Sequence, residues 1–236
     1  MPHVSLKYYM SAHFLEAAWH LARAAKDIEA EKIDDAEKGK VSRNFEIEHR
    51  GYVISSIFMS IAFVEAVINE LLSDSSEGQT SSFHGLTQRA ADLLGKMRPS
   101  KNARLPKSLA KYQNALAHAG KAAFDPKTSP FHEVCDVITL RNALVHYEPE
   151  TIESDATKDP NELHDWEQRL RNKFDENPLV TAGSVFFPDK CLSFGCAAWA
   201  YDVCGQLADE FCFRLQIQAP YSHQKARLPP LTKNVS

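Results

Sequence analysis

The sequence predicts an all-α protein, a bundle of four to five core helices with short connections. Apolar residues recur at spacings of three and four along several segments, whereas the two-residue alternation of a strand is scarce. Hydrophobic residues make up 44% of the 236 positions and charged residues 25%, close to the averages of globular proteins. We therefore expect a single helical domain over 1–236.

The apolar spacing predicts helices over these ranges: 8–30, 46–73, 86–97, 106–120, 130–147 and 190–217. The segment 46–73 is apolar almost all round, as in a helix buried on several sides, and we expect it to be the central rod. Gly120 is expected to close one of the shorter helices. Pro149 disfavours a helical conformation at the residue before it, so its helix should stop near Tyr147.

Three remaining features lie in the C-terminal third of the chain. Residues 151–189 read as a polar insertion, with a surface helix carrying the apolar positions Leu163, Trp166, Leu170 and Phe174. Within the insertion we expect a small β-hairpin near 179–188. The tail, 218–236, contains two adjacent prolines and is expected to be loose.

Cysteine usage and the N-terminus favour a cytoplasmic protein. None of the five cysteines lies two residues from a neighbour, and no basic segment with an apolar run marks export. The longest apolar tract is interrupted by Glu65 after about thirteen residues, short of the roughly 18 that a membrane span needs. We expect reduced thiols and no membrane.

Arg141 stands where a core residue is expected. It shares a helical stripe with these residues: Val134, Val137, Ile138 and Val145. An unpaired buried charge costs several kcal/mol, so Arg141 should either meet a carboxylate or line a wet cleft. Glu65, which interrupts the central rod, is the best internal partner. Whether such a pair is structural or catalytic stays open.

Asn142 and His146 lie four residues apart and should project from the same side of the helix. His146 falls in the last turn, where the helix dipole favours its protonated form. Such a histidine suits proton transfer near neutral pH. The alternative is that His146 merely caps the last carbonyls.

The run Arg141-Asn142-Ala143-Leu144-Val145-His146 resembles the signature of the HEPN superfamily, an arginine and a polar residue followed by a histidine. The stretch AFVEAVINEL, residues 62–71, is similar to the acidic, asparagine-bearing end of an early helix in that family. The resemblance implies a small α-helical bundle that often dimerises so that two motifs face each other. It also implies a metal-independent endoribonuclease, frequently a toxin or defence effector, with RNA and a neutralising antitoxin as partners.

The resemblance also implies roles for the three residues. His146 would be the general base on a ribose 2′-hydroxyl, and the products would be a 2′,3′-cyclic phosphate and a 5′-hydroxyl. Arg141 would stabilise the phosphorane, and Asn142 would orient His146 or bind the phosphate. No metal and no cofactor are expected.

A second match to the same pattern, Arg43-Asn44 followed by His49, carries two glutamates that would repel phosphate, and it precedes the central rod. We therefore prefer the match at 141. A di-metal carboxylate site is the other reading of this region, but only Glu46 and His49 have the required spacing.

A tract without acidic residues, from Leu93 to Phe124, is expected to bind nucleic acid through a local positive field. The residues predicted to contact RNA are Lys96, Arg98, Lys101, Arg104, Lys107 and Lys111. A solvated basic loop is the alternative. For the whole protein, the alternative function is a non-catalytic helical interaction or nucleotide-binding module.

Overall fold

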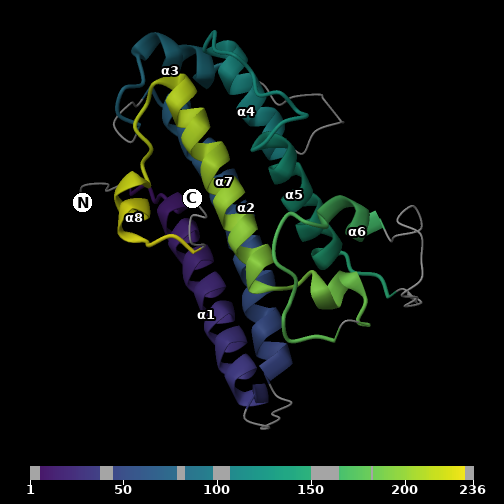
Figure 1. The fold of residues 1–236 in the computed structure, drawn as a ribbon. Coiled ribbons are helices and arrows are strands. Elements are labelled where there is room, and N and C mark those ends of the chain that lie inside the picture. Colours follow the sequence, from purple (N-terminus) through teal and green to yellow (C-terminus); the bar gives the residue numbers. More distant parts are fainter. Residues whose placement is uncertain are drawn as a thin grey trace.

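The computed structural model describes residues 6–37, 45–78, 83–97, 107–149, 165–181 and 183–231. Over these ranges the fold is all-α, as predicted, and no strand is present. The α-helices are α1 (Ser11–Glu37), α2 (Phe45–Ser76), α3 (Gln88–Gly95), α4 (Lys107–His118), α5 (Phe131–Val145), α6 (Asp165–Leu170), α7 (Phe194–Leu215) and α8 (Ser222–Arg227). Figure 1 shows α7 in front of α2, with α1 beside them and with α3 and α4 at one end.

The predicted central rod is α2, which packs most extensively against α1 and next against α7. Small residues on both neighbours are fully buried: Ala18, Ala22 and Ala25 of α1, and Ala197, Ala198 and Ala200 of α7. Small side chains let the helix backbones approach closely, so the larger Val and Ile side chains of α2 fill the space between them.

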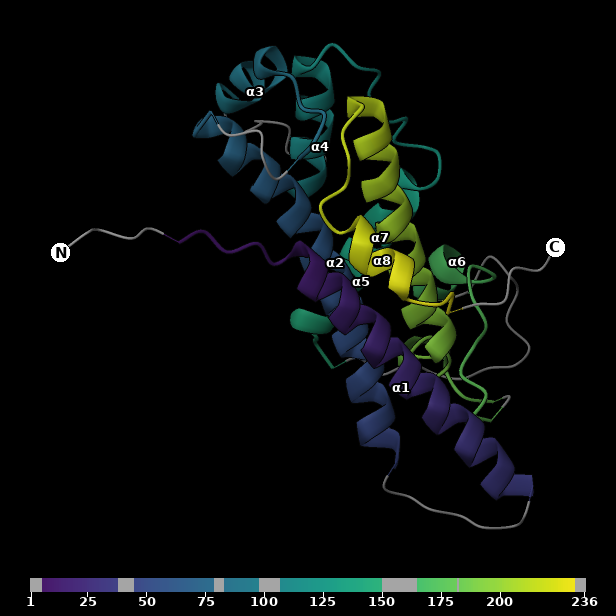
Figure 2. The same cartoon turned by 90° about the vertical axis from the view of Figure 1, so that its left-hand side faces the viewer.

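The outward side of α2 is only partly covered. Along one stripe, Ile54, Phe58 and Ala62 are half-buried, although each would be expected inside. Figure 2 shows α7 on one side of α2, with α3 and α4 at its upper end. By length and composition α2 could cross a membrane, with a best 18-residue mean hydropathy of 1.9 and half of that window buried. The core helix of a soluble protein passes the same test.

The insertion is attached to α5 through a buried carboxylate. Asp136, whose side chain is 1% exposed, lies 2.8 Å from Arg169 Nε and 3.2 Å from Lys173 Nζ. The surface helix expected around this segment is reduced to the short α6, and Leu170 beneath it is fully buried. Leu163 lies outside the described residues.

The hairpin predicted near 179–188 is wrong, since a π-helical turn over Phe186–Lys190 and irregular turns occupy the described part of the segment. Phe186 and Phe187 are both buried, which the alternating faces of a strand would not permit for neighbours in a surface hairpin. Asn177 organises the turn, because its side-chain oxygen accepts from Leu179 N at 3.0 Å and its amide donates to the carbonyls of Asp189 and Leu192.

The tail is not loose as far as Leu231. It docks on α1, where Trp19 Nε1 donates to Pro229 O at 2.8 Å and Lys26 Nζ donates to Leu231 O at 3.0 Å. Tyr221 is fully buried, with its ring edge on Phe63 at a centroid distance of 4.8 Å. The buried ring of Tyr221 and the side chains of Trp19 and Lys26 therefore hold this segment in place, although it contains little helix. Residues 232–236 lie outside the described chain.

Replacing Tyr221 by phenylalanine is expected to lower the free energy of unfolding by about 1 kcal/mol. The Tyr221 hydroxyl donates to Asp209 Oδ1 at 3.0 Å, and burial raises the pKa of this hydroxyl, so it remains a donor at neutral pH. Urea unfolding of Tyr221→Phe measures the loss, with Tyr147→Phe as an exposed control. Equal stability of Tyr221→Phe and wild type would mean that packing alone holds the tail.

Candidate functional site

The C-terminal end of α5 leaves the core. The helix stops at Val145, close to the predicted end, and the backbone N–H of His146 closes the last turn on Asn142 O at 2.9 Å. The side chains of Asn142 and His146 are exposed, and so is Tyr147. The cap contact at this end is therefore made by the backbone of His146, while its imidazole is accessible to solvent.

Arg141 pairs with Glu65, as predicted, with 3.3 Å between Nη2 and Oε1. Its expected burial is wrong: the side chain is 27% exposed and that of Glu65 is 46% exposed. The stripe that begins at the buried Val134 passes through Arg141 to Val145, which is 50% exposed, because α5 runs beyond the elements that cover its first turns. The pair consequently lies at the surface, and a guanidinium with five N–H donors retains several for a ligand.

A second polar contact continues the site along α2. Asn69 stands one turn after Glu65 on the same face, and Lys111 Nζ of α4 donates to Asn69 Oδ1 at 2.6 Å. The fully buried Tyr112 fixes α4 there, because its hydroxyl donates to Val64 O at 2.8 Å. Burial raises the pKa of Tyr112 well above its usual range, so the donor is retained at neutral pH. We name Arg141, Glu65, Asn69 and Lys111 the polar strip.

The polar strip joins the two regions that the sequence singled out, the motif of α5 and the basic tract. Of the predicted RNA contacts, Lys107 and Lys111 lie on α4, and Lys96 is exposed just after α3. Arg98, Lys101 and Arg104 lie outside the described residues. Sequence reasoning did not assign Asn69 to the site, although its four-residue spacing from Glu65 was a usable signal.

The second match to the motif is not arranged like the first. His49 is 2% exposed, and its Nε2 lies 2.9 Å from Glu29 Oε1. Arg43 and Asn44 lie outside the described residues. The alternative di-metal reading of Glu46 and His49 gains no further ligand, since the described residues contain no group of three His, Cys, Asp or Glu side chains suited to a metal ion.

The arrangement presents one accessible guanidinium held by a carboxylate, an exposed imidazole less than two turns further along, and a lysine on a neighbouring helix. Chemically, the guanidinium and the lysine can bind an anion, and an imidazole can exchange a proton. No protein-family model matches the chain, and neither a curated protein nor a solved structure is significantly similar to it.

Proposed function

We propose that the protein is a metal-independent endoribonuclease of the HEPN type, acting through Arg141, Asn142 and His146. The observation that supports this most is the surface position of the Arg141–Glu65 pair, with Asn142 and His146 exposed on the same end of α5. A purely structural ion pair would add little stability at such an accessible position, because exposed pairs contribute about 0–1 kcal/mol to the free energy of folding.

In the proposed reaction His146 removes the proton of a ribose 2′-hydroxyl, and the 2′-oxygen attacks the adjacent phosphorus. The bond from phosphorus to the 5′-oxygen breaks, and the leaving oxygen takes up a proton from solvent water, while the proton on His146 returns to solvent. Arg141 donates to Glu65 through Nη2 and offers its other N–H groups to the phosphate oxygens, which carry the developing charge. DNA lacks the 2′-hydroxyl and should not be cleaved.

Glu65 has a positioning role in this proposal. At 3.3 Å its contact with Arg141 is loose, so it restrains the guanidinium without using all its donors. Lys111, held by Asn69, extends the positive field from the motif onto α4. RNA would therefore run along the polar strip from α4 towards the end of α5.

The proposed enzyme acts as a homodimer of two copies of this chain. The half-buried apolar stripe of α2 runs towards Glu65, and Val145 and Tyr147 are about half exposed beside the motif. Covering this apolar face with a second copy would bring two motifs to one groove. An antitoxin that neutralises the enzyme would act by occupying the same face.

The test is cleavage of RNA by the purified protein in EDTA, followed by identification of the new ends. Products ending in a 2′,3′-cyclic phosphate and a 5′-hydroxyl support the proposal. Activity that appears only when a divalent ion is added, or cleavage of DNA at the same rate, would overturn it.

A second candidate function is a non-catalytic interaction module that works by dimerising or by binding a partner protein. The partly covered apolar stripe of α2 is the observation that favours it, because apolar side chains left accessible side by side can contact a partner. This candidate predicts association without any RNA cleavage, so the same assay separates the two.

The double replacement Lys107→Ala and Lys111→Ala is expected to weaken RNA binding at every sequence and to reduce its salt dependence. Each lost phosphate contact lowers the slope of log affinity against log salt by roughly 0.7 for a single strand. Fluorescence anisotropy with a labelled RNA at several salt concentrations gives the slope. The control is Lys127→Ala, an exposed lysine outside the polar strip. An unchanged slope in the double variant would place RNA elsewhere.

A further inference from the structure

A cavity of about 660 Å³ lies between the first turn of α5, the segment before α7 and the N-terminal part of α7. Each of these three elements contributes one carboxylate to the wall: Glu133, Asp175 and Asp202. The volume falls within the range of small-molecule sites. Among the described residues that line the cavity, none belongs to the polar strip or to the Arg141 motif.

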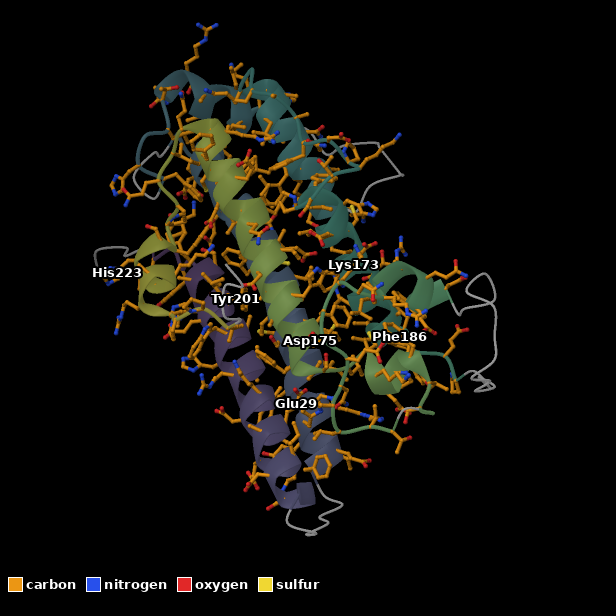
Figure 3. The ribbon with its side chains drawn as sticks, in the orientation of Figure 1. Glu29, Lys173, Asp175, Phe186, Tyr201 and His223 are labelled. Carbon is orange, nitrogen blue, oxygen red and sulfur yellow. The ribbon has the colours of Figure 1, made fainter. Side chains whose placement is uncertain are left out.

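The segment that carries Asp175 is fixed on α7 by a close backbone contact. Ser193, which is fully buried, donates from Oγ to Asp175 O at 2.7 Å. A Cβ on Gly195 would lie 2.4 Å from the same carbonyl oxygen, so glycine is needed for this approach. Figure 3 shows Asp175 beside the start of α7 and Lys173 nearer to α5. The position of the Asp175 carboxylate is therefore set by the backbone around it.

The wall carries an excess of negative charge. Lys173 supplies the single ammonium among the described lining residues, and three carboxylates against one ammonium leave a formal charge of −2. Lys173 Nζ also lies 3.2 Å from Asp136, a buried carboxylate outside the wall that pairs with Arg169 as well. A ligand with at least two positive charges therefore complements the wall. Because carboxylate oxygens accept hydrogen bonds, ammonium groups with N–H donors fit better than quaternary ones.

Aromatic rings form the apolar part of the same wall. Phe174 and Trp199 have ring centroids 5.4 Å apart, and Phe194 is the third ring. Lys173 Nζ lies 5.9 Å from the Trp199 centroid, so an ammonium of the chain itself already approaches one of these rings. Ring faces attract ammonium groups, and methylene groups pack on them. Rings beside separated carboxylates thus favour an aliphatic chain that carries several ammonium groups.

We propose that this cavity is a binding site for a polyamine, a linear aliphatic molecule with two or more ammonium groups. The ammonium groups donate to the carboxylates of the wall, and the methylene groups lie on Phe174 and Trp199. Trp199 Nε1 donates to Glu133 Oε1 at 3.3 Å, which holds this carboxylate beside the ring. The site is separate from the Arg141 motif and does not depend on RNA cleavage.

Isothermal titration of the full chain with spermidine at physiological salt tests the proposal. Wild type should bind spermidine, and Asp175→Asn should bind it about fivefold more weakly, because a charge-assisted hydrogen bond becomes a neutral one. Asp175 is exposed, so the unfolding midpoint should not change. Glu176→Gln is the matched control, since it removes the next exposed carboxylate, which does not line the cavity, and it should bind like wild type.

Two further variants test the ring wall and the charge of the cavity. Phe174→Leu keeps an apolar side chain but loses the ring face, and it should bind spermidine about threefold more weakly. Lys173→Gln removes the ammonium that competes for the wall and should bind spermidine more tightly than wild type. Poor folding cannot produce such a gain, so this variant keeps the proposal testable if the others are destabilised.

Several outcomes would overturn the site. These are absence of spermidine binding to wild type, an equal loss in Asp175→Asn and Glu176→Gln, or complete displacement of spermidine by Mg²⁺ at the same concentration of charge. The last two results would mean that a diffuse acidic surface attracts the cation. Equal affinity for hexylamine, which has one ammonium group, would overturn the recognition of a polyamine. None of these measurements involves RNA, so they leave the test of cleavage through His146 independent.

Discussion

Replacing His146 by alanine is expected to reduce the rate of RNA cleavage about 10²–10⁴-fold, the usual contribution of a general base. His146 is exposed after the last turn of α5, so its loss removes no buried contact and the fold should be unchanged. Single-turnover cleavage of a short RNA in EDTA measures the rate constant, and circular dichroism checks the helical content.

The matched control is His223→Ala, which removes another exposed histidine from a different helix. Arg141→Ala should lose activity to a similar extent. Because Arg141 and Glu65 are both partly exposed, its removal leaves a carboxylate that water can solvate, and stability should change by less than about 1 kcal/mol. Undiminished cleavage in His146→Ala would exclude the assigned base, whatever Arg141→Ala does.

Replacing Glu70 by alanine is expected to destabilise the protein by about 3 kcal/mol. Glu70 Oε1 accepts from the backbone N–H groups of Met10 and Ser11, at 2.6 and 2.8 Å, and Oε2 accepts from Ser11 Oγ at 2.6 Å. This carboxylate of α2 caps the start of α1, where negative charge is favoured. Without it, the two buried donors of Ser11 are left without partners, at about 1–3 kcal/mol each.

Urea unfolding gives the free energy, and amide hydrogen exchange at Ser11 reports the local loss. Glu70→Gln is the informative companion, because its remaining oxygen can still accept from the backbone, and it should cost about 1 kcal/mol. Glu77→Ala removes an exposed glutamate at the end of α2 and should have a small effect. If Glu70→Ala and Glu77→Ala are equally stable, the hydrogen-bond donors at the start of α1 find other partners when Glu70 is removed.

The helices could be predicted because their signals are local. The apolar repeat, Gly120 and Pro149 lie within the segments that they define, and α2, α4 and α5 formed close to the expected ranges. The order of the tail and of the turn before α7 could not be predicted in this way, because it comes from contacts with distant residues. Trp19 holds Pro229 across the bundle, and Asn177 bonds to Leu192 in the turn.

The candidate site could likewise be predicted only in part. A charged residue that interrupts an apolar stripe needs a partner, and this reasoning correctly joined Arg141 to Glu65. The exposure of the pair depends on how far α5 extends beyond its neighbours, which no local pattern gives. The link from Lys111 to Asn69 and the contact of His49 with Glu29 likewise depend on how whole helices dock.

The docking of the C-terminal segment on α1 has a consequence for biosynthesis. The contact between Trp19 and Pro229 spans 210 residues, and that between Lys26 and Leu231 spans 205. Helices form locally within about a microsecond, but these contacts cannot form until residues 229–231 have left the ribosome. The side of α1 that α8 covers therefore stays open while the residues between the two partners are synthesised.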